Sequence, residues 1–124
     1  MITMLPTWRK RGEFAYRGSV AGGTEILYGK KGRARVTAQQ YDGLLMTFVN
    51  RTVPLGTHRT NPPTDSIGHW LHCHGASHNI ASYVGPILIH EGYAIRGPQP
   101  HLIRVVRVLT DPQRPPLPGV APPR

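Results

Sequence analysis

The segment that decides the fold is Asp65–Val108, which reads DSIGHWLHCHGASHNIASYVGPILIHEGYAIRGPQPHLIRVVRV. Two runs in this segment place apolar side chains at helical spacing, and they predict helices over Ser66–His74 and His78–Glu91. Gly75 follows the first run and Gly92 the second, where a glycine can adopt the left-handed conformation just past a helix end. The pattern therefore predicts two consecutive helices.

Extended pieces follow these helices and also precede them. Two strands are predicted at Tyr93–Arg96 and His101–Val108, separated by a loop of glycine, proline and glutamine. Upstream, the sequence predicts a helix over Ala38–Val49 and a short strand over Thr52–Leu55. Thr37 and Gln40 form a capping-box signature at the start of that helix, and its apolar stripe consists of Tyr41, Leu44, Leu45 and Phe48.

The N-terminal third carries a β-hairpin signal. Glu25–Tyr28 and Arg33–Thr37 are extended runs that flank a turn of glycines and lysines. Phe14–Tyr16 is expected to form a short strand or an arm laid on the core. The predicted fold class is α+β, with a single domain over residues 1–109 and a proline-rich, disordered tail over residues 110–124.

Composition restricts the classes of function. The chain has 124 residues, 39% of them hydrophobic, and a formal net charge of +9, which favours a polyanionic partner such as DNA or RNA. No apolar run is long enough to span a membrane, and no signal-like segment precedes the basic residues near the N-terminus. The single cysteine agrees with a reducing compartment, so we expect a cytoplasmic protein without a membrane partner.

The order helix, strand, helix, helix, strand, loop, strand resembles the winged helix-turn-helix arrangement. The resemblance covers about half of the chain and consists of element order and apolar pattern. It implies that His78–Glu91 enters the DNA major groove while the loop between the last two strands touches the backbone. By this analogy His78, Asn79, Ser82 and Tyr83 would read base edges, as histidine, asparagine and serine side chains can.

Phosphate contacts are expected from seven basic residues. Four of them surround the predicted hairpin turn, and three lie on or near the last two strands. The predicted contacts are Lys30, Lys31, Arg33, Arg35, Arg96, Arg104 and Arg107. Tyr28 and Tyr16 could stack on exposed bases if the ligand is single-stranded.

Two features depart from the winged-helix pattern. No lysine or arginine occurs between Arg59 and Arg96, so the proposed reading helix carries no fixed positive charge. Pro86 lies in the middle of that helix, where a proline removes a hydrogen bond and costs about 3 kcal/mol in an ordinary interior. Either the helix kinks at Pro86, or a helix begins there.

A cluster of histidines around Cys73 suggests two alternatives. His69 and Cys73 are one helical turn apart, and His58 or His78 could complete a zinc site, which would make the protein a metal-dependent sensor or small enzyme. Cys73 beside His72 and His74 could also act as a nucleophile, with Asp65 or Glu91 orienting a histidine. The cluster lacks the paired spacing of established zinc motifs, and neighbouring helix residues point in different directions.

The sequence therefore favours a regulatory or accessory protein that binds double-stranded DNA and does not catalyse a reaction. We expect it to form a homodimer and to need no cofactor. The first alternative is a protein-interaction module of winged-helix shape, whose uncharged face around Ser77–His90 docks another protein. The second is the histidine and cysteine metal site. RNA is the third possible partner, because the same positive charge attracts it.

Overall fold

The structure is a computed structural model, and it describes residues 2–57, 63–76 and 80–109. The chain has the α+β class that the sequence predicts. In chain order its elements are β1 (Ile2–Pro6), β2 (Glu13–Ser19), β3 (Gly23–Tyr28), β4 (Gly32–Val36), α1 (Ala38–Phe48), β5 (Thr52–Pro54), α2 (Ile67–Cys73), α3 (Ala81–His90), β6 (Ala94–Arg96) and β7 (Leu102–Val105). The order from α1 to β7 is the predicted one.

Helix α1 begins at the capping box that the sequence indicates. The Thr37 hydroxyl accepts a hydrogen bond from the Gln40 backbone N–H at 3.0 Å, and the Gln40 side chain accepts one from the Thr37 N–H at 2.9 Å. All four residues of the predicted stripe are buried. Gly43 lies against Trp70, whose ring would be 3.0 Å from an added Cβ, so close helix packing explains the glycine.

Helix α3 is continuous across Pro86, so the alternative in which a helix begins at Pro86 is wrong. A proline has no N–H, and the carbonyl of Ser82, four residues earlier, therefore lacks its usual helical partner. The backbone N–H of Trp8, in the β1–β2 loop, donates to the Ser82 carbonyl at 3.0 Å. A hydrogen bond from the N-terminal part of the chain thus replaces the one that the proline removes.

Strands β1 to β4 form an antiparallel sheet in sequential order, which we name sheet A. The β3–β4 hairpin was predicted, but the strand expected at Phe14–Tyr16 is longer, and β1 was not predicted. Phe14 and Tyr16 are buried, whereas the flanking residues on β2 are more exposed. This period of two is a strand signal, and the mixed polar and aromatic composition around it obscured it.

Strands β5, β7 and β6 form a second antiparallel sheet in that order, which we name sheet B. All three strands were predicted, with bounds that extend beyond the observed ones. Alternate residues of β7, Ile103 and Val105, are buried, and Arg104 between them lies on the outer face. The β6–β7 hairpin is closed by the loop at Gly97–His101, where the Gly97 N–H donates to Leu102.

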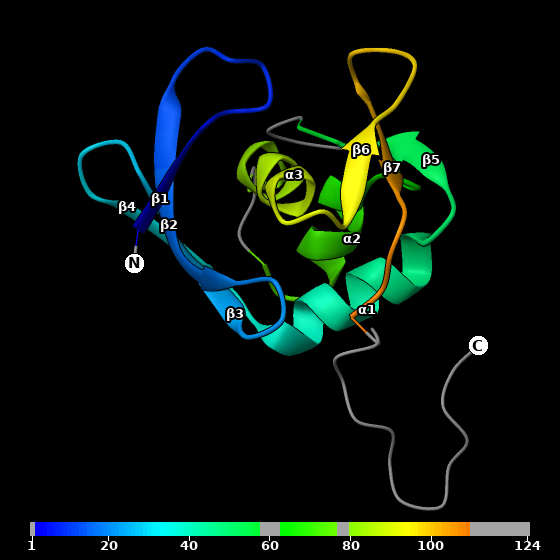
Figure 1. The fold of residues 1–124 in the computed structure, drawn as a ribbon, viewed down its shortest axis with the longest axis horizontal. Helices are drawn as coiled ribbons and strands as arrows, with labels where there is room; N and C mark the ends of the chain where they lie inside the picture. Colours follow the sequence, from blue (N-terminus) through cyan, green and yellow to red (C-terminus); the bar gives the residue numbers. More distant parts are fainter. Residues whose placement is uncertain (1, 58–62, 77–79, 110–124) are drawn as a thin grey trace, which may run out of the picture.

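Helix α3 lies between the two sheets, with α1 and α2 along the adjoining side (Figure 1). One hydrophobic core contains side chains from sheet A, sheet B and the helices. Glu91, just after α3, accepts hydrogen bonds from the Tyr16 hydroxyl at 2.7 Å and from the Val20 backbone N–H at 2.9 Å. The helix is therefore attached to sheet A by Ser82 near its beginning and by Glu91 at its end.

Some predictions concern residues that the structure does not describe. The proline-rich tail, residues 110–124, lies outside the described residues, as do His58, His78 and Asn79. Within the described residues, none of the helices has the length and apolar character needed to cross a membrane.

Glu91→Ala is expected to lower the free energy of unfolding by about 3 kcal/mol, because it removes a charged acceptor from two partly buried donors. Urea denaturation measures this change. Glu13→Ala is the matched control, because Glu13 is exposed at the start of β2, and its effect should stay within about 0.5 kcal/mol. Equal effects of the two substitutions would contradict the role of Glu91 in fastening α3 to sheet A.

Alkaline pH should destabilise the fold through three tyrosines. Burial raises the pKa of Tyr16, Tyr41 and Tyr83, and the Glu91 carboxylate raises that of Tyr16 further. Because the raised pKa values favour the protonated form in the folded protein, the stability they give is complete below the ordinary value of about 10 and is lost above it. Phenolate absorbance should therefore rise together with loss of the near-ultraviolet circular dichroism. Full tyrosine ionisation of a still folded protein would refute this.

Candidate nucleic-acid interface

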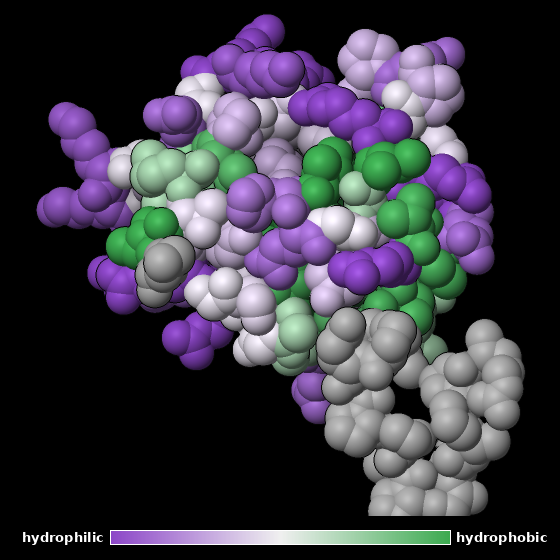
Figure 2. Space-filling model, in the orientation of Figure 1, coloured by the Kyte–Doolittle hydropathy of each residue, from purple (hydrophilic) through white to green (hydrophobic). Residues whose placement is uncertain are grey.

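The topology of sheet A collects two basic loops at one end. In a sequential antiparallel sheet the first and third turns lie at the same end, and here they are the β1–β2 loop and the β3–β4 turn. We name this surface the basic end; its residues are Arg9, Lys10, Arg11, Lys30 and Lys31, all exposed. Figure 2 shows strongly hydrophilic side chains protruding at both loops.

The positive charge of the basic end is largely uncompensated. Glu13, at the start of β2, is the acidic residue beside it. In residues 2–57, 63–76 and 80–109 the structure holds one side-chain ion pair, between Arg33 and Glu25 at 3.5 Å, and Arg33 is 72% exposed. Such an exposed pair contributes little to stability. The basic end can therefore release counterions when it meets a polyanion.

The β1–β2 loop has a fixed backbone. The N–H of Thr7 donates to Gly12 at 2.9 Å, and the N–H of Lys10 donates to Thr7 at 2.9 Å. Lys10 adopts the left-handed conformation with φ of 59°, which costs a non-glycine residue roughly 1–2 kcal/mol. These hydrogen bonds compensate for that cost and hold the loop backbone in a defined arrangement.

Trp8 attaches this loop to sheet B as well as to α3. The indole N–H donates to the Pro100 carbonyl at 2.9 Å, and the Trp8 carbonyl accepts from the Arg96 guanidinium at 2.9 Å. The guanidinium carbon lies 3.9 Å from the indole ring centroid, a cation–π contact. Trp8 is 4% exposed, so its side chain is part of the core. The β1–β2 loop and the β6–β7 loop therefore lie side by side.

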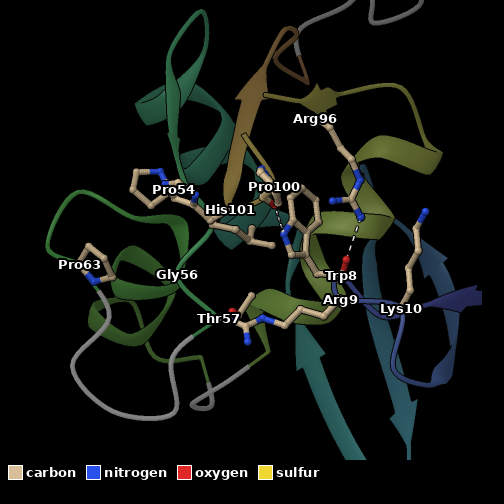
Figure 3. A pocket seen from close by; sticks show the side chains of 11 residues that line it. Trp8, Arg9, Lys10, Pro54, Gly56, Thr57, Pro63, Arg96, Pro100 and His101 are labelled. Atoms are coloured by element: carbon tan, nitrogen blue, oxygen red, sulfur yellow. Dashed lines mark hydrogen bonds between the residues drawn. The ribbon is translucent and has the colours of Figure 1, made fainter. Parts of the chain in front are cut away.

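A cavity of about 900 Å³ adjoins Trp8, between the β1–β2 loop, the end of β5 and the β6–β7 loop (Figure 3). We name it the Trp8 cavity. It is lined by Trp8, Arg9, Lys10, Pro54, Leu55, Gly56, Thr57, Pro63, Arg96, Pro100 and His101. The lining combines apolar side chains with cationic ones and contains no carboxylate. Its volume lies within the range of small-molecule sites, about 300–1,000 Å³.

The structure separates the basic residues that the sequence grouped together. Lys30 and Lys31 belong to the basic end, and Arg33 and Arg35 alternate on the exposed face of β4 beside it. Arg96 reaches Trp8, as described above. Arg104 lies on the outer face of sheet B, where it donates to the Thr52 hydroxyl at 3.3 Å.

Arg107 lies elsewhere, at the end of the molecule opposite the basic end. Its guanidinium is 4.6 Å from the Tyr93 ring and donates to the Glu91 carbonyl at 3.4 Å. The Glu91 carboxylate in turn accepts from Val20, which follows β2. Because the β2–β3 turn lies at the other end of sheet A from the basic end, Arg107 does not extend that surface.

The structure places Ser82 and Tyr83, two of the predicted base readers, at half-buried positions on the side of α3 that packs against sheet A and the β1–β2 loop. The Tyr83 ring stacks on Tyr28 and tilts against Phe14, with both centroid distances 5.0 Å. The Ser82 carbonyl holds Trp8. The other two predicted readers lie outside the described residues.

The packing around α3 bears on two further expectations, the stacking of Tyr16 on a base and the docking of another protein. Tyr16 is 3% exposed and donates to Glu91, so it cannot stack on a base. The protein-interaction alternative needs a free face on the same helix. Within Ala81–His90, half of the residues are buried in the core and the others are half-buried or exposed. This alternative stays a hypothesis.

The histidine and cysteine cluster forms local contacts on and after α2. The Cys73 sulfur lies 3.4 Å from Nε2 of His69, and the His74 ring stacks on Trp70 at a centroid distance of 3.8 Å. Within the described part of the chain, no three histidine, cysteine or acidic side chains converge as metal ligands would. Glu91, proposed to orient a histidine, binds Tyr16 and Val20 instead.

Sequence reasoning missed Arg9, Lys10 and Arg11 as site residues. Their signal was the basic run itself, next to Trp8. Without the β1–β2 hairpin, nothing in the sequence placed this run at the same end of a sheet as Lys30 and Lys31. Strand pairing supplied that arrangement.

Gly85→Ala is expected to destabilise the fold by about 1–3 kcal/mol, although alanine favours helices. The added Cβ would lie 2.7 Å from a Leu55 methyl and 2.9 Å from the Trp8 ring, both of which are buried. Urea denaturation followed by tryptophan fluorescence measures the loss. Gly12→Ala is the control, because nothing lies within 4 Å of its added Cβ. If Gly85→Ala is as stable as the control, the close contact of α3 with Trp8 is refuted.

Comparisons with protein-family models, with curated proteins and with solved structures find no match to this chain. The functional argument therefore depends on the residues of the basic end and of the Trp8 cavity themselves. Both depend on the position of the β1–β2 loop, which Trp8 fixes.

Proposed function

We propose that the protein binds double-stranded DNA without catalysing a reaction, and that it does so through phosphate contacts of the basic end. The observation that carries this proposal is that the β1–β2 loop with Arg9, Lys10 and Arg11 lies at the same end of sheet A as the β3–β4 turn with Lys30 and Lys31. Rows of fixed cations with few nearby carboxylates suit a phosphate backbone. The chain's net charge of +9 acts in the same direction over longer distances.

The segment from α1 to β7 supports a winged-helix assignment as part of the same proposal. Its elements follow the expected order, and β5 pairs with β7 in a sheet that ends in the β6–β7 hairpin. The β6–β7 loop corresponds to the wing, and it lies beside the basic loop because Trp8 binds Pro100. The wing and the basic end would therefore contact the backbone together, while α3 has a structural role.

This binding mode favours contacts that do not depend on base sequence. Of the four side chains proposed as base readers, Tyr83 packs on Phe14 and Tyr28, Ser82 is half-buried, and the other two lie outside the described residues. Phosphate contacts position a protein on a duplex and carry no base information. An accessory or architectural role follows more directly from this arrangement than operator recognition. The predicted homodimer, the absence of a cofactor and the cytoplasmic location stay predictions.

The salt dependence of binding tests the electrostatic part. Affinity for a short blunt-ended DNA duplex, measured by fluorescence anisotropy, should fall steeply between about 50 mM and 200 mM salt. The logarithm of the affinity should decrease linearly with the logarithm of the salt concentration, by about 0.9 per phosphate contact. A flat response, or binding of duplex RNA in preference to duplex DNA, would overturn the proposal.

Substitution of the hairpin lysines tests the location of the surface. Lys30→Ala with Lys31→Ala should weaken duplex binding at least tenfold and reduce the salt slope by about 2, since each phosphate contact accounts for roughly 1. The matched control is Arg51→Ala with Arg107→Ala, which removes equal charge near the end of β7 opposite the wing. The control should retain the wild-type slope. Equal losses in both variants would indicate that net charge, and not the basic end, drives binding.

A further inference from the structure

We propose that the Trp8 cavity receives a single unpaired nucleotide of a DNA strand, an inference that rests on the proposed function. The base would enter the apolar interior, and the adjacent phosphate would remain at the cationic rim. The protein would then prefer DNA with an unpaired or displaced nucleotide to fully paired duplex.

The apolar wall suits a planar base. Three prolines contribute its accessible part, from the end of β5, the segment before α2 and the β6–β7 loop, and they lie over the buried side chains of Trp8 and Leu55. The Trp8 ring cannot move freely, because its indole N–H binds Pro100 and its face carries Arg96. The cavity wall is therefore formed before any ligand arrives, which reduces the entropy cost of binding. Bases have apolar faces that pack on such surfaces whatever their identity.

The rim selects an anionic group. Arg9, Lys10, Arg96 and His101 line the cavity, and no aspartate or glutamate does. Figure 3 shows Arg9 extending from the β1–β2 loop toward Thr57, whereas the Lys10 side chain points in another direction. A cationic or strongly basic peptide would be repelled here. The ligand that matches both parts is an apolar ring with an attached anion, as in a nucleotide.

Shared residues connect the cavity with the path of the DNA backbone. Arg9 and Lys10 belong both to the basic end and to the cavity lining. A strand whose phosphates contact the basic end can therefore place one nucleotide in the cavity without leaving that surface. A nucleotide in a paired duplex must first unstack, at a cost of a few kcal/mol, whereas an unpaired one does not.

Three DNA probes test the proposal with the full-length protein. They are a blunt duplex, the same duplex with one unpaired thymidine, and the same duplex with an abasic site at the unpaired position. The wild type should bind the unpaired thymidine about tenfold more tightly than the other two, a difference of about 1.4 kcal/mol that burial of roughly 50 Å² of apolar base surface can supply. The abasic probe keeps the phosphate and lacks the base, so it separates base capture from duplex flexibility.

A matched pair of variants places the effect in the cavity. Thr57→Phe fills part of it from a half-buried lining residue, and Thr52→Phe makes the same change on the exposed start of β5. Thr57→Phe should abolish the preference for the unpaired thymidine while blunt-duplex affinity stays within twofold. Thr52→Phe should keep the preference.

The two tryptophans provide a second readout that needs no variant. Trp8 lines the cavity and Trp70 lies on α2 outside its lining. Titration with thymidine 5′-monophosphate should shift the indole N–H resonance of Trp8 and leave that of Trp70 in place. Inorganic phosphate should shift neither.

The outcomes distinguish the cavity proposal from the proposed binding of duplex DNA. Equal affinity for all three probes, or an unshifted Trp8 resonance, overturns the cavity proposal and leaves duplex binding by the basic end intact. A preference that survives Thr57→Phe also overturns it. Failure to bind any duplex overturns the proposed function and this inference with it.

Discussion

The hydrogen bond from the Trp8 N–H to the Ser82 carbonyl is the interaction on which the arrangement of this molecule depends. It exists because Pro86 cannot donate to Ser82 within α3. A helix proline is normally a local defect whose free carbonyl must find water or another donor. Here the defect provides the attachment point for the β1–β2 loop, and it thereby determines where the basic residues after Trp8 lie.

Enclosure of α3 follows from this attachment. Sheet A covers the flank of the helix that carries Tyr83, and Glu91 fastens the other end through Tyr16 and Val20. The aromatic contacts bury large rings that would otherwise face water, which stabilises the packed arrangement. The same contacts leave Tyr83 half-buried between α3 and sheet A.

Positive charge is exposed in the loops at one end of sheet A. Few carboxylates offset the cations, and Glu91 is occupied inside the fold. The β1–β2 loop contributes to two neighbouring surfaces at once, the basic end and the rim of the Trp8 cavity. This continuity is the physical reason for treating backbone contact and nucleotide capture as parts of one binding mode. The hydrogen-bonded backbone of the β1–β2 loop, in which Lys10 has a left-handed conformation, fixes the position of one surface relative to the other.

The sequence by itself determined the local elements: the capping box at Thr37, the glycines at helix ends, and the strands of sheet B all follow from short-range hydrogen bonding and periodicity. Only the tertiary structure decided that Arg9 and Lys30 lie at the same end of sheet A and that Tyr83 packs on Phe14 and Tyr28. Both depend on pairing between distant residues, and in the case of Pro86 on a donor 78 positions upstream. A window of neighbouring residues carries no information about such a partner, because its energy comes from burial and hydrogen bonds that exist only once the chain has folded.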